Sequence, residues 1–404
     1  MNTFRLATAW FAGLVCTGVF AGVGVGAARP AAAAAECECW RYVRTGDTGA
    51  DTTLGDVAAP GPGVAWATGS RGNRPMLMTW TGTRWRETPV GFPTGTLLEG
   101  IAATSPRDAW VMGYDDGKPE IARWTGRRWA SVSMPTTGPT FPRAVDARTP
   151  ADAWIVGSRD GFAGARAGVW HWDGRSWSAA PLDADAGVNS ELVAVSAYGA
   201  RDAWAVGASG TTPPRQLLFH WDGKDWTAAP APEPPAESEL TDVTMVSGDN
   251  VWAVGGTTSA TGSRRPATRA PRQAAARPMR RHALRTTKPV QPPSRDSRPL
   301  AEHWNGRAWR VMPAPAIDGE FYSVAGDGAS GVWAAGQRAD GSALLAHWDG
   351  RGWDISRPPT PDGRGPAAVW AITQVRGTSY LWAVGPVEGP MYQALTWTNA
   401  PRPR

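Results

Sequence analysis

Cysteine and histidine are scarce in this sequence, with three and five copies among 404 residues. Cys16 lies in the apolar N-terminus, and the other two cysteines form the motif "ECECW" at Cys37 and Cys39. A single intervening residue is too short for an unstrained disulfide, and two ligands alone do not close a zinc site. Terminal thiols that oxidise or pair between chains are the favoured interpretation, and metal binding is the alternative. We therefore predict no metal site and no cofactor.

Helical patterns and familiar catalytic motifs are also missing. After the N-terminus the chain shows no long charge-free helical pattern, while glycine (48) and proline (36) are abundant, which favours strands and turns. The sequence contains no G-x-S-x-G, no H-E-x-x-H and no phosphate loop. Nothing therefore indicates a helical enzyme.

The one long apolar run extends from Leu6 to Ala28. Residues 1–35 predict a secretory signal peptide, because the alanine-rich tail of this segment offers an A-x-A cleavage site near Ala35. The run approaches the roughly 20 residues that span a bilayer, so the alternative is an uncleaved anchor that attaches the protein to the cell surface. Cleavage and secretion are favoured, because no stop-transfer charge cluster follows the run.

Tryptophan, by contrast, is abundant, with 24 copies against six tyrosines and eight phenylalanines. The stretch "HWDGRSWSAAP" from His171 is one of six related copies along the chain. A second phrase, of the type "DAWAVG", occurs seven times at intervals of 44 to 50 residues and one of 81. Its tryptophans are Trp66, Trp110, Trp154, Trp204, Trp252, Trp333 and Trp382.

Each repeat predicts four short strands: an apolar strand, the "WAVG" strand, the "HW" strand and a strand after the Asp-Gly turn. The first strand is marked by a β-branched residue nine positions before the second-strand tryptophan, and Val369 is the expected counterpart in the last repeat. Four-stranded units of about 40 to 50 residues that cannot bury their own faces are typical of propeller blades. The prediction is an all-β, seven-bladed β-propeller over residues 36–404.

The two ends of the repeat array complete each other. The last repeat stops after a third strand that carries Trp397, whereas Trp40 precedes the first repeat at the place of a fourth-strand tryptophan. We predict that the N-terminal stretch supplies the outer strand of blade seven and closes the ring without a free edge. The repeated tryptophans, including the pair Trp172 and Trp177, are interpreted as packing between blades and not as a ligand platform.

The repeats resemble those of kelch-type propellers, the class that includes the central domain of galactose oxidase, and are similar to repeat proteins exported by actinobacteria. The phrases "DAWAVG" and "HWDGxxW" carry this resemblance from Trp40 to Trp397, and the kelch double glycine occurs at Gly255 and Gly256 alone. For galactose oxidase the resemblance implies a copper site of two histidines, two tyrosines and a cysteine. Four of the five histidines here occupy one repeat position in separate blades, so they cannot converge on one metal.

Fold does not define function among propellers. The predicted function is a non-catalytic extracellular binding or interaction scaffold, whose ligand is a glycan, a cell-envelope polymer or a protein. The alternative is a secreted propeller enzyme that acts on carbohydrate through acidic residues of its loops. The protein is expected to be a monomer.

The 81-residue interval reflects a basic insertion in blade five, between the second and third strands. Residues 258–298 hold eleven Lys or Arg and one Asp, whereas the rest of the chain after residue 35 holds 28 basic and 35 acidic residues. Low apolar content and scattered prolines predict a loop that is disordered when free. Polyanion binding is predicted for Arg264, Arg265, Arg269, Arg272, Arg277, Arg280, Arg281, Arg285 and Lys288. Specific nucleic-acid binding is not predicted, because no aromatic residue interleaves these charges, and an insertion without a role is the alternative.

Three glutamates, Glu191, Glu239 and Glu320, lie four residues before the β-branched residue of three consecutive first strands. They predict an acidic arc near the central opening, on the face that the basic loop shares. Our hypothesis is that the loop folds over this arc and gates a site for a cationic or hydroxyl-rich ligand. Solvated strand entrances are the alternative interpretation.

Deleting residues 258–298 tests the role of the loop. If the loop is an electrostatic tether, salt-sensitive binding of the mature chain to isolated cell-envelope polymers should vanish with it. Binding that persists or grows without the loop would contradict the tether and direct the search to the acidic face.

Overall fold

The computed structural model describes residues 39–46, 51–161, 164–182, 186–210, 214–233, 237–258, 292–361, 367–389 and 391–401. These residues form seven four-stranded antiparallel sheets, which we number as blades one to seven in chain order. The predicted seven-bladed all-β propeller is confirmed. Within these ranges, no helix is long and apolar enough to cross a membrane.

Each blade uses its strands in the predicted order. The first strands are β2 (Thr52–Gly61), β6 (Leu97–Ser105), β10 (Thr140–Thr149), β14 (Ser190–Gly199), β18 (Glu237–Ser247), β22 (Gly319–Gly326) and β26 (Ala371–Gln374). The second strands are β3 (Val64–Arg71), β7 (Asp108–Asp115), β11 (Asp152–Arg159), β15 (Asp202–Ser209), β19 (Asn250–Thr258), β23 (Val332–Arg338) and β27 (Leu381–Val387). The third strands are β4 (Arg74–Trp80), β8 (Lys118–Trp124), β12 (Arg166–Trp172), β16 (Arg215–Trp221), β20 (Ser297–Trp304), β24 (Ala343–Trp348) and β28 (Gln393–Thr398). The fourth strands are β5 (Trp85–Glu87), β9 (Trp129–Ser131), β13 (Trp177–Ala180), β17 (Trp226–Ala228), β21 (Trp309–Val311), β25 (Trp353–Ser356) and β1 (Arg41–Val43).

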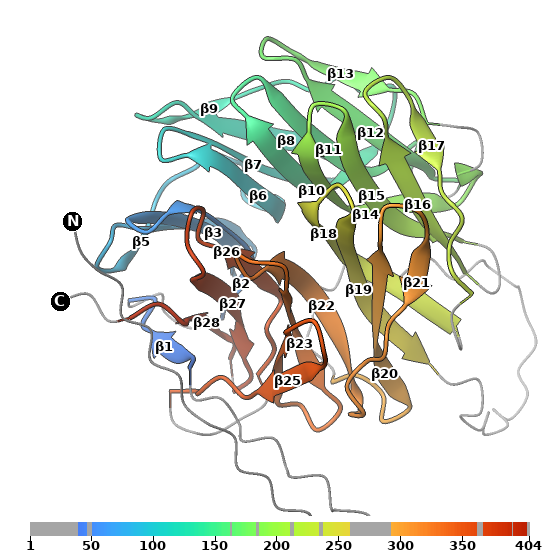
Figure 1. The fold of residues 1–404 in the computed structure, drawn as a ribbon. Helices are drawn as coiled ribbons and strands as arrows, with labels where there is room; N and C mark the ends of the chain where they lie inside the picture. Colours follow the sequence, from blue (N-terminus) through green and yellow to red (C-terminus); the bar gives the residue numbers. More distant parts are fainter. Residues whose placement is uncertain are drawn as a thin grey trace, which may run out of the picture. The chain divides into compact units, whose positions relative to one another are not determined.

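The ring closes through the N-terminal strand. Each first strand contacts the first strand of the next blade, and β26 of blade seven contacts β2 of blade one. The strand β1 pairs antiparallel with β28, with Tyr42 opposite Trp397, and completes blade seven as its outermost strand. Figure 1 shows this meeting of the two ends of the described chain, with blue β1 beside red β28. The predicted closure is confirmed.

The glycine of the "WAVG" phrase is required by the approach of the first strand. In blade two, a Cβ at Gly113 would collide with the carbonyl oxygen of Leu97, and in blade four one at Gly207 would collide with that of Glu191. The corresponding glycine meets a carbonyl oxygen in the same way in all seven blades, and in blade seven that oxygen belongs to Ala368, which precedes β26. The repeated glycine therefore lets the innermost strand lie directly on the second strand.

Tryptophans join each blade to the preceding one. The tryptophan at the start of a fourth strand, or directly before it in the case of Trp40, lies edge-on against the second-strand tryptophan of the preceding blade, with ring centroids 5.0 to 6.2 Å apart. The seven pairs are Trp85–Trp382, Trp129–Trp66, Trp177–Trp110, Trp226–Trp154, Trp309–Trp204, Trp353–Trp252 and Trp40–Trp333. Trp172 packs on Trp110 as well, with centroids 4.9 Å apart. The interpretation of Trp172 and Trp177 as packing residues is confirmed, as is the fourth-strand role of Trp40.

The histidines of the "HW" phrase are bonded within their own blades. His171 Nε2 lies 2.8 Å from Asp152 Oδ1, and the ring of His171 stacks on Trp154 with centroids 4.1 Å apart. His220 bonds the equivalent Asp202, and His303 bonds Asn250 Oδ1 at 2.9 Å. His347 bonds Asp327, which lies in the connection between β22 and β23. In four of the seven blades, a histidine thus bonds the start of the second strand or the turn before it. Among the described residues, no cluster of three His, Cys, Asp or Glu side chains could hold a metal ion.

Trp397 occupies a different position from the one expected. In blade two the third-strand Trp124 pairs with Ala109, the residue before the second-strand tryptophan, whereas Trp397 pairs with Ala383, the residue after it. Trp397 therefore corresponds to Trp170, which pairs with Ile155 in blade three. The likeness extends to the indole nitrogens, which donate to the carbonyl oxygens of Pro359 and Pro135.

The expected position of Val369 is also wrong. Val57 of blade one pairs with Ala67, the residue after the second-strand tryptophan, and the corresponding pair in blade seven is Ile372 with Ala383. Val369 precedes β26, and its amide donates to the carbonyl oxygen of Gly336 in blade six. The longer turn between β26 and β27 shifts the register by one residue against the repeat.

Replacing Trp40 with alanine tests the closure. Trp40 is 4% exposed and packs on Trp333, so we expect the free energy of unfolding in urea to fall by about 3 to 5 kcal/mol. Tyr198→Ala is the control, because that aromatic side chain is 55% exposed. If both variants lose the same small amount, β1 does not stabilise the ring.

Candidate functional site

The candidate site lies on the loop face, which we define as the face formed by the hairpins between second and third strands and the links between blades. Glu191, Glu239 and Glu320 stand at the starts of β14, β18 and β22 on this face. They pair with Ala208, Gly256 and Gln337 respectively, each of which directly follows the packing glycine of its blade. The three glutamates therefore occupy equivalent positions in consecutive blades, but their surroundings differ.

Glu191 belongs to a buried ion-pair cluster. Arg143 Nε donates to Glu191 Oε1 at 2.6 Å, and Arg143 Nη1 donates to Glu99 Oε1 at 3.2 Å. The hydroxyl of Ser158 also donates to Glu191, and Arg143 Nη1 donates to the hydroxyl of Tyr114. The cluster joins blades two, three and four, so Glu191 has a structural partner and does not lie with the other two glutamates.

The electrostatics of this cluster follow from its burial. The side chains of Arg143, Glu99 and Glu191 are 8%, 5% and 7% exposed. Burial opposes the charge of Arg143, but Glu191 and Glu99 outweigh it and hold the pKa of the guanidinium above its usual value. Burial, followed by the charge of Glu99, raises the pKa of Tyr114. The cluster therefore links three blades through buried ion pairs.

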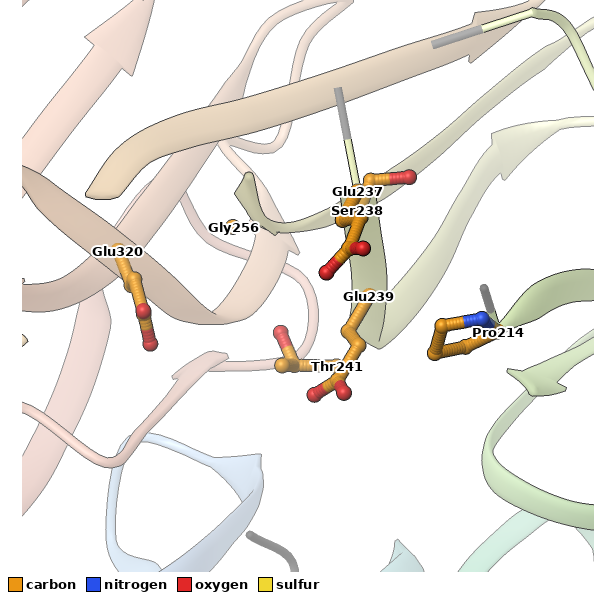
Figure 2. A pocket seen from close by; sticks show the side chains of 7 residues that line it. All are labelled: Pro214, Glu237, Ser238, Glu239, Thr241, Gly256 and Glu320. Carbon is orange, nitrogen blue, oxygen red and sulfur yellow. The ribbon is translucent and has the colours of Figure 1, made fainter. Parts of the chain in front are cut away.

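Glu239 and Glu320 line an acidic pocket of about 150 Å³ on the loop face of blades five and six. Figure 2 shows the side chains of Glu239 and Glu320 directed the same way, with Thr241 between them and Pro214 of blade four at the side. The pocket is lined by Pro214, Glu237, Ser238, Glu239, Thr241, Gly256 and Glu320. Two of the three predicted glutamates therefore meet in one cavity, together with a third carboxylate that sequence reasoning missed.

Gly256 opens this pocket. The equivalent position carries the side chains of Tyr114 and Ser158 in blades two and three, where they contact the Arg143 cluster. A Cβ at Gly256 would lie 2.7 Å from Cγ of Glu320 and would displace that side chain. The second glycine of the pair Gly255 and Gly256 thus replaces a side chain with space.

The pocket is suited to a compact cationic group. Three carboxylates and the hydroxyls of Ser238 and Thr241 make its wall rich in hydrogen-bond acceptors. Thr241 Oγ1 also lies 3.1 Å from the carbonyl oxygens of Val254 and Phe321, which ties this wall to blade six. Pockets for drug-sized ligands have volumes of roughly 300 to 1,000 Å³. The smaller cavity here fits a single ammonium or guanidinium head group.

A strand irregularity places several of these residues, and it was not foreseen from the sequence. Six first strands contain a register shift two residues before their β-branched residue. The residues at this shift are Gly55, Glu99, Arg143, Val193, Thr241 and Tyr322. The variety of side chains at one position of an otherwise regular strand is the signal that could have identified Arg143 and Thr241.

Other predicted residues lie outside the described part of the chain. They are Arg264, Arg265, Arg269, Arg272, Arg277, Arg280, Arg281, Arg285 and Lys288 of the basic loop, together with residues 1–35 and Cys37. The hypothesis that the basic loop gates the acidic arc involves these residues. Cys39 is disulfide-bonded.

No protein-family model and no curated protein matches this sequence. Among solved structures, the chain is similar to YCF48 bound to D1 peptide, with 14% identity and a TM-score of 0.56 over 90% of this chain and 98% of that chain. YCF48 from Cyanidioschyzon merolae is 17% identical, with a TM-score of 0.53 over 89% of this chain and 98% of that chain. A streptogramin B lyase is 11% identical, with a TM-score of 0.57 over 89% of this chain and 97% of that chain. At these identities the likeness shows the propeller fold alone, and the kelch-like assignment stays a prediction.

Breaking the Arg143 cluster tests its structural role. Arg143→Met should lower the free energy of unfolding by about 3 to 5 kcal/mol, because it leaves Glu99 and Glu191 buried without their cation. Arg71→Met is the control, since the Arg71–Glu87 pair is 38% and 45% exposed and such pairs contribute about 0 to 1 kcal/mol. Equal small losses in urea unfolding would show that the cluster is not a cross-link.

Proposed function

We propose that this protein is an exported, non-catalytic binding scaffold whose acidic pocket takes a cationic side chain of a protein or peptide ligand. The observation that carries the proposal is the meeting of Glu237, Glu239 and Glu320 around one small cavity. Carboxylates that share a partly enclosed site attract cations more strongly than scattered surface carboxylates do, because the low-dielectric walls focus their field.

The fold supports a binding role for this face. The tryptophan contacts repeat around the whole ring and hold the blades, so strand starts on the loop face are presented by a rigid frame. A rigid frame lowers the ordering cost of binding. One structural neighbour, YCF48, is described as bound to a peptide, which is compatible with a peptide ligand here.

The proposed location rests on the sequence. Residues 1–35 have the pattern of a cleavable signal peptide, so the scaffold would act outside the cell, with surface attachment through an uncleaved anchor as the alternative. The basic segment 258–298 would add a second, salt-sensitive attraction to polyanions such as envelope polymers.

Binding of a pentalysine peptide tests the pocket. Calorimetry should detect binding to the full chain, none for the fully acetylated peptide, and at least about tenfold weaker binding for the Glu239→Gln, Glu320→Gln double variant, because charge-assisted hydrogen bonds contribute roughly 1.5 to 3 kcal/mol. Gly256→Ala should also weaken binding, because it displaces Glu320 without a change of charge.

Two controls separate the pocket from general electrostatics. Asp354→Asn removes an exposed carboxylate in β25, and Gly61→Ala adds a methyl group where no atom lies within 4 Å. Both should bind pentalysine like the unaltered chain. If Asp354→Asn weakens binding as much as the pocket variants do, the pocket is not the site. Turnover of sugar polymers that is lost with Glu239→Gln would instead favour the carbohydrate-active enzyme.

A further inference from the structure

Blade five contains a buried carboxyl group where every other blade has an uncharged residue. Glu302 pairs with Ala253, the residue after the second-strand tryptophan, and its side chain is fully buried. The equivalent third-strand residues of the other blades are Met78, Ala122, Trp170, Phe219, Ala346 and Trp397. A carboxyl group in this position costs stability unless it is neutral or well bonded, so its presence needs a physical reason.

Glu302 is connected to the acidic pocket through one glutamine. Gln216 Nε2, on β16 of blade four, donates to Glu302 Oε1 at 2.9 Å and to Ser238 Oγ at 3.0 Å. Gln216 and Ser238 are 7% and 6% exposed, and Ser238 lines the pocket beside Glu239. These two hydrogen bonds therefore connect Glu302, in the seam between blades four and five, to the pocket wall at Ser238.

Two oxygen atoms of the hydrogen-bonded group Glu302, Gln216 and Ser238 lack a hydrogen-bond donor. Within the described residues, Glu302 Oε2 and Gln216 Oε1 are buried and have no hydrogen-bond partner. Both are acceptors while Glu302 is ionised, so neither can satisfy the other. A proton on Glu302 supplies a donor to this group, whereas loss of that proton leaves a buried carboxylate with a single hydrogen bond.

The charged side chains on the surrounding strands do not stabilise an ionised Glu302. They are Arg215 on β16, Glu237, Glu239 and Asp242 on β18, Arg298 and His303 on β20, and Arg310 on β21. In the described part of the chain, Gln216 is the only group that hydrogen-bonds the carboxyl. Burial raises the pKa of Glu302 to about 7, and the bond from Gln216 opposes that shift in part.

We propose that Glu302 is a protonation-dependent lock between blades four and five, which holds the pocket wall in place through Gln216 and Ser238. With Glu302 neutral the seam is closed and dry. With Glu302 ionised the carboxylate draws water into the seam, and Gln216 and Ser238 shift with it. The lock itself depends only on these contacts, while its effect on a ligand rests on the function proposed for the pocket.

The direction of the pH effect follows from the raised pKa. In the folded protein Glu302 binds a proton more tightly than in the unfolded chain, whose carboxyl has its ordinary pKa of 4.5. The contribution of Glu302 to stability is therefore fully present below pH 4.5 and is lost as the pH rises to about 7. The lock is closed in mildly acidic conditions and released above neutrality.

Hydrogen exchange of the ligand-free full chain tests the lock directly. We expect segments that include β16 and β20 to lose protection between about pH 5.5 and about pH 8.5, after correction for intrinsic exchange, by at most about tenfold per pH unit. Glu302→Gln, which stays neutral, should keep its protection at both values. Glu302→Met introduces the residue that blade one has at this position and should behave in the same way.

Hydrogen exchange of a third variant, Glu87→Gln, provides the control. Glu87→Gln alters an exposed carboxylate of blade one and should follow the unaltered chain. Unchanged protection in the unaltered chain, or an equal loss in Glu302→Gln, would overturn the lock. If Glu302→Gln fails to fold, the comparison of Glu302→Met with the unaltered chain tests the lock in the same way.

Pentalysine binding at the same two pH values separates the lock from the pocket function. If the lock and the pocket function are both right, the peptide binds the unaltered chain more weakly at the higher pH, and Glu302→Gln removes that difference. If the unaltered chain binds no peptide at either pH, the pocket function fails while the exchange result still decides the lock. An identical pH dependence in both proteins would show that the lock does not reach the pocket.

Discussion

The contact between each second-strand tryptophan and the tryptophans of the next blade is the interaction on which the rest of the structure depends. A single four-stranded blade cannot bury its own faces, so its stability comes from its two neighbours. Edge-on aromatic pairs add about 0.5 to 1.5 kcal/mol each beyond the area they bury. Because this contact recurs seven times, the last gap must be filled too, and Trp40 against Trp333 fills it with a residue from the other end of the described chain.

This dependence explains which parts of the fold could be predicted from the sequence. A tryptophan and a glycine that recur at fixed spacing are required by sterics in every blade, so the number of blades and the closing strand followed from them. The last blade was predicted less well, because the sequence does not show which residues pair. Trp397 in "LTWTN" resembles the third-strand tryptophan of "AHWDG", but pairing with Ala383 places it at the position of Trp170.

The site was predictable only as far as it follows the repeat. Glu239 and Glu320 could be aligned by counting from the first-strand valine, and the structure brings both to one pocket. Glu191 satisfies the same count, yet Arg143 binds it from the preceding blade, 48 residues earlier in the chain. Such a partner depends on which side chain the neighbouring blade carries at its strand irregularity. Counting along a repeat gives the position of a residue within its blade. The charge and hydrogen-bond partners of that residue come from the neighbouring blade, which the count does not include.

Blade five shows how departures from a repeat can be weighed physically. Asn250 replaces the aspartate found at the same position in blades three and four, but His303 keeps its hydrogen bond, so this change preserves the local structure. Gly256 removes a side chain and creates the space of the pocket. Glu302 places a carboxyl group at a fully buried position and leaves one of its oxygens without a donor. Of these three departures, Glu302 is the one that lowers stability when it is ionised and that no local contact fully compensates. A role in function is therefore the more economical explanation for Glu302, which is joined to the pocket wall through Gln216.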